Sequence, residues 1–95
     1  MIKSFADKET EKIFNGEFSK KLPVDIQKTA SRKLSWLNVA NSLNELVMIP
    51  ANRLESLVGN RSGQWSIRIN NQWRITFTPI NGGKDYINVK IEDYH

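Results

Sequence analysis

The spacing of hydrophobic residues along the chain changes near Pro50. Before this point, apolar residues recur every three or four positions, which is the repeat of one face of an α-helix. After it, apolar residues alternate with polar ones, which is typical of strands that bury one face. The pattern therefore predicts a helical first half and a β-sheet second half. The clearest helical stripe comprises Ile26, Ala30, Leu34, Leu37 and Ala40.

Cap and turn residues divide the first half into helices. Asp7 suits the N-cap of a first helix, which Asn15-Gly16 would end with a left-handed residue. Pro23 suits the first turn of a second helix, which carries the stripe. Ser42 and Glu45 have the spacing of a capping box, and they predict a short third helix.

Three alternating segments predict an antiparallel sheet with one apolar face, which the amphipathic helices cover. The fold class is therefore α+β, with N-terminal helices packed on one face of a small antiparallel β-sheet. The short apolar stretch 2–5 is compatible with an edge strand. The three segments are residues 65–70, 73–78 and 87–92, with turns marked by Asn70-Asn71 and by residues 81–85.

The register of the first hairpin brings two arginines together. Directly opposed residues of antiparallel strands share a face, so the apolar sets of both strands must match. A three-residue connection at 70–72 achieves this match by pairing Ile69 with Trp73. The same register places Arg68 opposite Arg74.

The second hairpin allows more than one register. Pairing Phe77 with Ile87 places Lys90 opposite Arg74, which would add a third cation to the same site. A shift of this pairing by two residues keeps the apolar face but changes the neighbour of Arg74.

Composition excludes several classes of chemistry. The 95-residue chain is expected to form one domain over residues 1–95, because cores split only in much longer chains. It has no cysteine, which excludes disulfides, thiol nucleophiles and thiolate metal sites. His95 is the single histidine, so we expect no multi-histidine zinc site and no cofactor. No apolar run approaches the ~20 residues of a membrane span, and residues 1–10 are too charged for a signal peptide, so we expect a cytoplasmic protein.

Positive charge is concentrated around the first hairpin. The chain carries 14 Lys and Arg against 10 Asp and Glu, a formal net charge of +4. Residues 53–74 contain four arginines and one acid, Glu55, and therefore hold +3 of that charge. Arginine forms bidentate contacts to phosphate, so this face is a candidate anion site. Alternatively, Arg68, Arg74 and Lys90 are solvated cations on an open face, and their long side chains point apart. On the second helix, Lys28, Arg32 and Lys33 lie off the apolar stripe, and we expect them on a solvated face.

The last residues are candidates for acid–base chemistry. His95 can exchange a proton near neutral pH, and Asp93 can orient it or stabilise its charge. Tyr94 can donate a hydrogen bond or stack on a base. The alternative is that this end of the chain is frayed, as termini often are.

Several stretches, taken together, resemble a known family. The chain contains PANRLESLVGNR at 50–61, GQWSIRIN at 63–70 and QWRI at 72–75, and it closes with DYH at 93–95. The opening MIKSF and the segment RKL at 32–34 fit as well. In order and spacing these stretches resemble the HigB-type toxins, also called plasmid-maintenance killer proteins, of the RelE/ParE superfamily.

The resemblance implies a RelE-like fold and the toxin of a type II toxin–antitoxin system. Members of this family inhibit translation by cleaving mRNA in the ribosomal A site, through metal-independent attack of a ribose 2′-hydroxyl on the adjacent phosphate. The implied partners are mRNA on the 30S subunit and a HigA-type antitoxin with a helix-turn-helix domain. Operator DNA would be contacted only through the antitoxin, and no membrane is involved.

The resemblance also implies roles for individual residues. His95 is the acid–base candidate, and Asp93 is the carboxylate that orients it. Tyr94 is a base-stacking or proton-handling residue. Arg74 would stabilise phosphate charge, and Arg68 would support it. The remaining residues expected to contact RNA are Arg53, Arg61, Lys90 and Asn52.

One departure from the family pattern concerns a second catalytic histidine. Some relatives carry it before the first strand of the hairpin, where this chain has Asn52, Arg53, Leu54 and Glu55. Asn52, Arg53 and Glu55 remain open as substitutes. The departure also keeps a second function open, that of a ParE-like inhibitor of DNA gyrase or another protein without nuclease chemistry.

Overall fold

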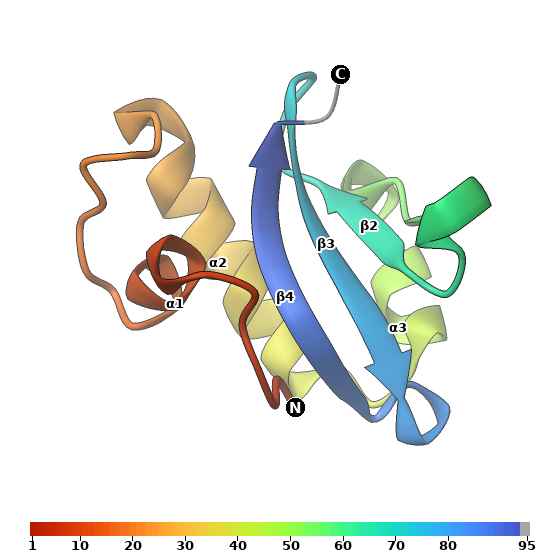
Figure 1. The fold of residues 1–95 in the computed structure, drawn as a ribbon. Coiled ribbons are helices and arrows are strands. Elements are labelled where there is room, and N and C mark those ends of the chain that lie inside the picture. Colours follow the sequence, from red (N-terminus) through yellow and green to blue (C-terminus); the bar gives the residue numbers. More distant parts are fainter. Residues whose placement is uncertain (94–95) are drawn as a thin grey trace.

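Helices precede a four-stranded antiparallel sheet in the computed structural model, which describes residues 1–93 (Figure 1). The strands follow one another in the sheet in the order β1-β2-β3-β4. This arrangement confirms the predicted α+β class. The helices are α1 (Lys8–Phe14), α2 (Val24–Val39) and α3 (Leu43–Val47), with 3-10 turns η1 (Pro50–Asn52), η2 (Gly59–Arg61) and η3 (Asn81–Gly83). The strands are β1 (Glu55–Ser56), β2 (Trp65–Arg68), β3 (Trp73–Ile80) and β4 (Asp85–Asp93).

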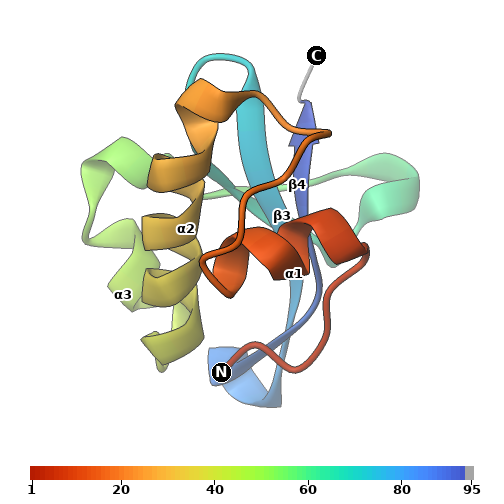
Figure 2. The same cartoon turned by 90° about the vertical axis from the view of Figure 1, so that its left-hand side faces the viewer.

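Helices α1 and α2 cover one face of the sheet, over β3 and β4 (Figure 2). The carboxylate of Asp7 accepts a hydrogen bond from the Thr10 N–H at 2.8 Å and caps α1 as predicted. Every residue of the predicted stripe is at most 4% exposed. Full burial of one such aliphatic side chain is worth about 1.5–3 kcal/mol, so this face holds α2 on the sheet. The sheet side of the core comprises Ile67, Ile75, Phe77, Tyr86, Val89 and Ile91.

The cap of α3 differs from the predicted capping box. Ser42 is the N-cap residue, but its side chain makes no capping hydrogen bond. Glu45 does reach back, and its Oε2 accepts from the N–H of Asn41 at 2.9 Å, one residue earlier than predicted. Neither hydrogen bond of the predicted box is therefore formed, and the Glu45 carboxylate binds the residue before the cap instead.

The first hairpin has the predicted register. Ile67 lies opposite Ile75, Trp65 opposite Phe77, and Arg68 opposite Arg74. The backbone N–H groups of Ile69 and Asn70 both donate to the Trp73 carbonyl.

Beside Arg74 the second hairpin has the alternative register, shifted by two residues from the pairing of Phe77 with Ile87, so Lys90 lies opposite Thr76 rather than Arg74. The cause is a register shift between Thr76 and Thr78, where two residues of β4 oppose Phe77. One of the two, Asn88, has a φ of 55°. A β-bulge of this kind reverses the side-chain alternation of the strand beyond it.

The bulge changes which aromatic and aliphatic side chains enter the core. Tyr86 and Val89 are both fully buried, and Ile87 is only partly buried. The Tyr86 ring meets Phe77 edge to face, with centroids 5.3 Å apart. The bulge also brings Glu92, instead of Lys90, opposite Arg74.

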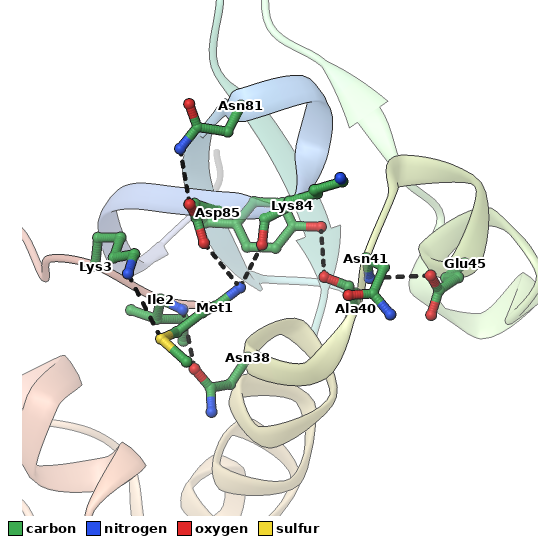
Figure 3. A network of polar contacts seen from close by, with 11 residues as sticks. Met1, Ile2, Lys3, Asn38, Ala40, Asn41, Glu45, Asn81, Lys84 and Asp85 are labelled. Carbon is green, nitrogen blue, oxygen red and sulfur yellow. Dashed lines mark hydrogen bonds and ion pairs between the residues drawn. The ribbon is translucent and has the colours of Figure 1, made fainter.

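The N-terminal segment covers the free edge of β4, where isolated parallel bridges join Ile2 to Tyr86 and Phe5 to Val89. The predicted edge strand therefore pairs with the sheet only at these two bridges. Figure 3 shows how this segment is anchored: the Met1 amino group lies 3.5 Å from the Asp85 carboxylate, and the Ile2 N–H donates to Asn38 of α2 at 2.9 Å. Within residues 1–93, no helix combines the length and apolar composition needed to cross a membrane.

Candidate functional site

The sheet face turned away from α1 and α2, here called the outer face, carries the predicted cations of the hairpin. Side chains alternate along a strand, so Arg68 and Arg74 face away from the core residues Ile67 and Ile75. The charged side chains of this face pack against one another, so several of them are partly or fully buried. Its members are Glu55 of β1, Ser66 and Arg68 of β2, Arg74 and Thr76 of β3, and Lys90 and Glu92 of β4.

Arg74 lies at the centre of this face and is only 6% exposed. Its Nε donates to Ser66 Oγ at 2.8 Å, and its Nη2 donates to the backbone carbonyls of Arg53 and Ser66. Its Nη1 lies 3.3 Å from Glu55 Oε1. A planar guanidinium held by several partners has a fixed orientation. The Glu55 side chain is 52% exposed, so the ion pair opens to solvent on the glutamate side.

The η1 turn supplies one of the carbonyls that hold Arg74. Arg53 follows this turn with a φ of 44°, a left-handed conformation that a non-glycine residue adopts at a cost. Its carbonyl accepts from Arg74, while the residue itself remains exposed.

Asn52 is fully buried, and its amide donates to the Leu46 carbonyl at 3.2 Å. Its Oδ1 has no hydrogen-bond partner within residues 1–93. The Asn52 side chain thus faces the interior, where it fixes the turn that presents Arg53.

Arg68 is paired with Arg74 in register, but the two guanidinium groups point apart. Arg74 extends toward Ser66, whereas Arg68 donates to Asn71 in the hairpin turn. The alternative left open by the sequence, solvated cations whose long side chains point apart, is therefore right about these directions but wrong about Arg74, which is buried.

A second cluster on the outer face surrounds Glu92. Arg61 forms a bidentate pair with its carboxylate, in which Nη1 lies 3.3 Å from Oε1, and the Thr76 hydroxyl also donates to it. Burial opposes ionisation of this carboxyl, but the hydrogen bonds from Arg61 and Thr76 and the charges of Arg61 and Lys90 lower the pKa of Glu92 overall. The predicted cations Arg61 and Lys90 are therefore gathered around an acid that sequence reasoning did not include.

The end of β4 lies beside the β2–β3 turn (Figure 1). Asp93 is opposite Trp73, next to Arg74 along β3, and it accepts a hydrogen bond from the Gln72 side chain at 3.0 Å. The other two members of the terminal triplet, Tyr94 and His95, lie outside the described residues.

Lys33 does not lie on a solvated face, and that expectation was wrong. It is 5% exposed, and its Nζ donates to the Arg68 carbonyl at 2.6 Å. The cause is the length of the side chain, because a lysine beside the buried stripe reaches across the end of the sheet. Burial, followed by the charges of Arg32, Arg68 and Arg74, lowers the pKa of Lys33.

The arrangement presents an oriented guanidinium next to an accessible carboxylate, in a surface with several further cations. Such a surface can bind a phosphate and move a proton beside it. Alternation along the strands predicted Arg68 and Arg74. The same alternation places Ser66 and Glu92 at outward positions, and the register of β4 sets Glu92 opposite Arg74. No periodic signal marks Lys33. Among residues 1–93, no group of three or more His, Asp or Glu side chains is placed to hold a metal ion.

Comparison with protein families gives a match over nearly the whole chain. The family model described as "RelE-like toxin of type II toxin-antitoxin system HigB" matches residues 3–95.

Individual proteins show the same similarity. The chain is 35% identical to the endoribonuclease HigB of Proteus vulgaris over 95 residues, which is 100% of both chains. It is 36% identical over 83 residues to the toxin HigB-1 of Vibrio cholerae, covering 86% of this chain and 87% of that protein. The solved YoeB–YefM complex from Staphylococcus aureus matches with a TM-score of 0.57 at 16% identity, covering 100% of this chain and 98% of that chain. The last match concerns the fold alone, and it confirms the predicted RelE-like fold.

Proposed function

Because the chain belongs to the HigB family of RelE-like type II toxins, we propose that it is an endoribonuclease that cleaves mRNA in the ribosomal A site. It inhibits translation in the cytoplasm, and a HigA-type antitoxin neutralises it. The resemblance derived from the sequence is thereby confirmed at the level of the family, and the ribosomal reaction is the proposal.

The observation that carries the proposal is the oriented Arg74 guanidinium on the outer face. It lies next to the end of β4, where Asp93 begins the terminal triplet. Asp93 is opposite Trp73, the residue before Arg74. In this proposal Tyr94 and His95, which follow Asp93 directly in the sequence, act together with Arg74. The whole-length similarity to an endoribonuclease supports the same assignment.

The reaction needs no group outside the chain. The ribose 2′-oxygen attacks the adjacent phosphorus, its proton passes to a base on the protein, and the bond from phosphorus to the 5′-oxygen breaks. His95 protonates the leaving 5′-oxygen, so the products are a 2′,3′-cyclic phosphate and a 5′-hydroxyl. Asp93 orients His95, Tyr94 stacks on a base, and Arg74 and Arg68 stabilise the charge of the pentacoordinate phosphate. Exposed Arg53, with Arg61 and Lys90, attracts the RNA backbone.

Glu55 is the proton acceptor in this proposal. Of the three residues that sequence reasoning left open, Asn52 is buried and Arg53 is a cation, whereas Glu55 is a half-exposed carboxylate 3.3 Å from Arg74. When a phosphate binds, Arg74 exchanges Glu55 for a phosphate oxygen. The released carboxylate then accepts the 2′-hydroxyl proton.

Induced expression of Arg74→Ala and Glu55→Gln variants tests the proposal. Loss of one preorganised charge contact lowers the rate of such reactions on the order of 10²–10³-fold. We therefore expect both variants to relieve growth arrest and to remove the new 5′ ends in A-site codons that primer extension detects with the wild type. Lys8→Ala, which removes an exposed cation of α1, is the matched control and keeps full toxicity.

Two outcomes would overturn the proposal. Full toxicity of both variants would remove the outer face from the mechanism. Growth arrest by the wild type without new mRNA ends would exclude cleavage and favour an inhibitor of gyrase or of another protein.

A further inference from the structure

One ion pair on the outer face has no step of its own in the proposed reaction. It joins Arg61, in the η2 turn between β1 and β2, to Glu92 near the end of β4. The sheet order places β2 and β3 between β1 and β4. The pair therefore ties the connection at one side of the sheet to the strand at its opposite edge.

The Arg61 guanidinium is fixed through all three of its nitrogens. Its Nε donates to Gln64 Oε1 at 2.9 Å, and Nη1 and Nη2 both donate to the Glu92 carboxylate. The backbone of Gln64 closes the same connection, because its N–H donates to the Arg61 carbonyl and its carbonyl accepts from the buried Leu57. A bidentate pair of this kind fixes orientation as well as distance. Arg61 is therefore a rigid arm on a fixed base.

Glu92 is held from two elements at once. The hydroxyl of Thr76 on β3, itself 2% exposed, donates to the carboxylate that Arg61 also binds. Burial opposes ionisation, but these hydrogen bonds outweigh it and keep the pKa of Glu92 below its ordinary value. The carboxylate therefore stays charged, and loss of Arg61 would leave it unpaired in a partly buried place.

This anchor lies where β4 ends. Glu92 is opposite Arg74, and the next residue, Asp93, is the last of the strand. Chain ends fray unless they are tied down, and Asp93 has only an exposed hydrogen bond from Gln72 in addition to contacts along the strand. A displacement of about 1 Å at a reacting group can lower a rate on the order of 100-fold. The anchoring of Glu92 therefore matters for any reaction that uses the residues after it.

The exposure of the two acids on this face indicates which arginine gives up its partner. The Glu55 side chain is 52% exposed, so water solvates it when Arg74 turns to a phosphate. The Glu92 side chain is 18% exposed, so release of Arg61 would leave a poorly solvated charge. Arg61 adds to the charge that attracts RNA, but its bidentate donors remain with Glu92.

We infer that Arg61 and Glu92 are a positioning pair for the proposed cleavage: they fix the end of β4 against Arg74, and thereby fix where the terminal triplet begins. The inference rests on the proposed function, which gives Asp93 and the two residues after it their part in the reaction. It assigns Arg61 to the geometry of the site rather than to contact with a phosphate.

The first measurement is the maximum rate of cleavage. Single-turnover cleavage of mRNA in the A site is followed at saturating ribosome concentration for the wild type, Arg61→Gln, Glu92→Gln and the double variant. We expect each single variant to lower this rate about 10–100-fold. The double variant should lose no more than a single variant, because both changes remove the same pair.

The affinity for a non-cleavable 2′-O-methyl RNA is the readout that a merely structural role would not move. Glu92→Gln removes an acid from the outer face and releases Arg61. We therefore expect this variant to bind RNA at least as tightly as the wild type while it cleaves more slowly. Arg61→Gln should keep the salt slope of RNA binding, because no phosphate contact is lost.

Glu9→Gln is the matched control. The Glu9 side chain is 19% exposed, pairs with Lys12 and accepts from the Ser19 hydroxyl, so its surroundings resemble those of Glu92, but it lies on α1. We expect this variant to keep the wild-type cleavage rate and RNA affinity. Urea denaturation of every variant gives the folded fraction by which its rate is normalised.

Hydrogen exchange tests the anchor without any cleavage. We expect the backbone amides of residues 91–93 to exchange at least about tenfold faster in Arg61→Gln than in the wild type, and at the wild-type rate in Glu9→Gln. Unchanged exchange in Arg61→Gln would overturn the inference, and so would a wild-type maximum rate in either single variant. A salt slope reduced by about 0.7 in Arg61→Gln would also overturn it, because Arg61 would then contact a phosphate. Failure of the proposed function would appear separately, as a wild type that cleaves no mRNA, and the exchange rates would still decide whether the pair holds β4.

Discussion

At the level of single residues, two buried cations of this protein are held in different ways. Arg74 is held by a hydroxyl, two carbonyls and the Glu55 carboxylate. Lys33 donates to one carbonyl, that of Arg68, and it faces the charges of Arg32, Arg68 and Arg74. Burial first, and then these neighbouring charges, disfavour the charged form of Lys33, and this has a consequence for stability.

The stability of the protein is expected to rise with pH through the titration of Lys33. Its pKa in the folded state lies below the ordinary value of 10.5, so the folded protein releases this proton at a lower pH than the unfolded chain does. Between the two values the unfolded state binds more protons, and the free energy of unfolding therefore increases with pH. Urea unfolding at pH 7 and pH 9.5 measures this change, and Lys33→Met removes it.

The comparison between variants isolates the lysine. At a single pH, Lys33→Met removes a desolvated charge but leaves the Arg68 carbonyl unpaired, and these two effects oppose each other. The readout is therefore how the difference between wild type and variant changes with pH. The exposed Lys28→Met on the same helix is the control and should show no such change. An equal difference at both pH values for Lys33→Met would contradict the assignment.

At the level of elements, the two hairpins differ in how far their sequences determine them. In the first, three connecting residues leave one register that matches Ile67 with Ile75, and this register also defines the pair Arg68 and Arg74. In the second, the strands contain a bulge. Ile87, Val89 and Ile91 alternate as if they shared one face of the sheet, but Ile87 lies beyond the bulge and is on the other face. The left-handed conformation of Asn88 depends on its neighbours in the fold and cannot be read from alternation.

The site shows the same division. Outward positions of regular strands, such as Arg68 and Arg74, could be predicted because their neighbours are apolar core residues. Glu92 also occupies an outward position, but its place opposite Arg74 depends on the register of the second hairpin, which alternation leaves open. The sequence also does not determine the direction of a long side chain. The burial of Lys33 and of Arg74 therefore could not be predicted.

The bulge can be tested at Asn88. Valine at a φ of 55° is strained by its branched Cβ, whereas glycine adopts this conformation freely. We expect Asn88→Val to lower the free energy of unfolding by about 1–2 kcal/mol, and Asn88→Gly to leave it within about 0.5 kcal/mol. Urea denaturation with unchanged m-values is the measurement. Equal stabilities of the two variants would mean that this residue does not hold the register.

At the level of the whole molecule, the modest net charge of +4 hides two separate basic surfaces. One is the outer face of the sheet around the hairpin. The other is formed by the exposed charges of residues 17–32, after α1 and along the first half of α2, which balance to +2. On the outer face, two of the arginines are already paired with acids: Arg61 with Glu92, and Arg74 with Glu55. The charge that this face offers to RNA is therefore smaller than the arginine count suggests.

The salt dependence of RNA binding measures this available charge. Each phosphate neutralised on a single strand contributes about −0.7 to the slope of log K against log salt. If Arg53, Arg68, Lys90 and Arg74 make the contacts, we expect a slope of roughly −3 for a non-cleavable 2′-O-methyl RNA, measured by fluorescence anisotropy between about 50 and 300 mM KCl.

Variants assign the slope to the outer face. Arg68→Gln should reduce its magnitude by about 0.7, because one phosphate contact is lost, and Lys8→Gln on α1 should leave it unchanged. A slope near −2 would mean that Arg74 stays paired with Glu55, which contradicts the proposed exchange, and a slope near −3.5 would mean that Arg61 also leaves Glu92. A flat response would contradict RNA binding by this face, because an interface that neutralises no phosphate releases no counterions.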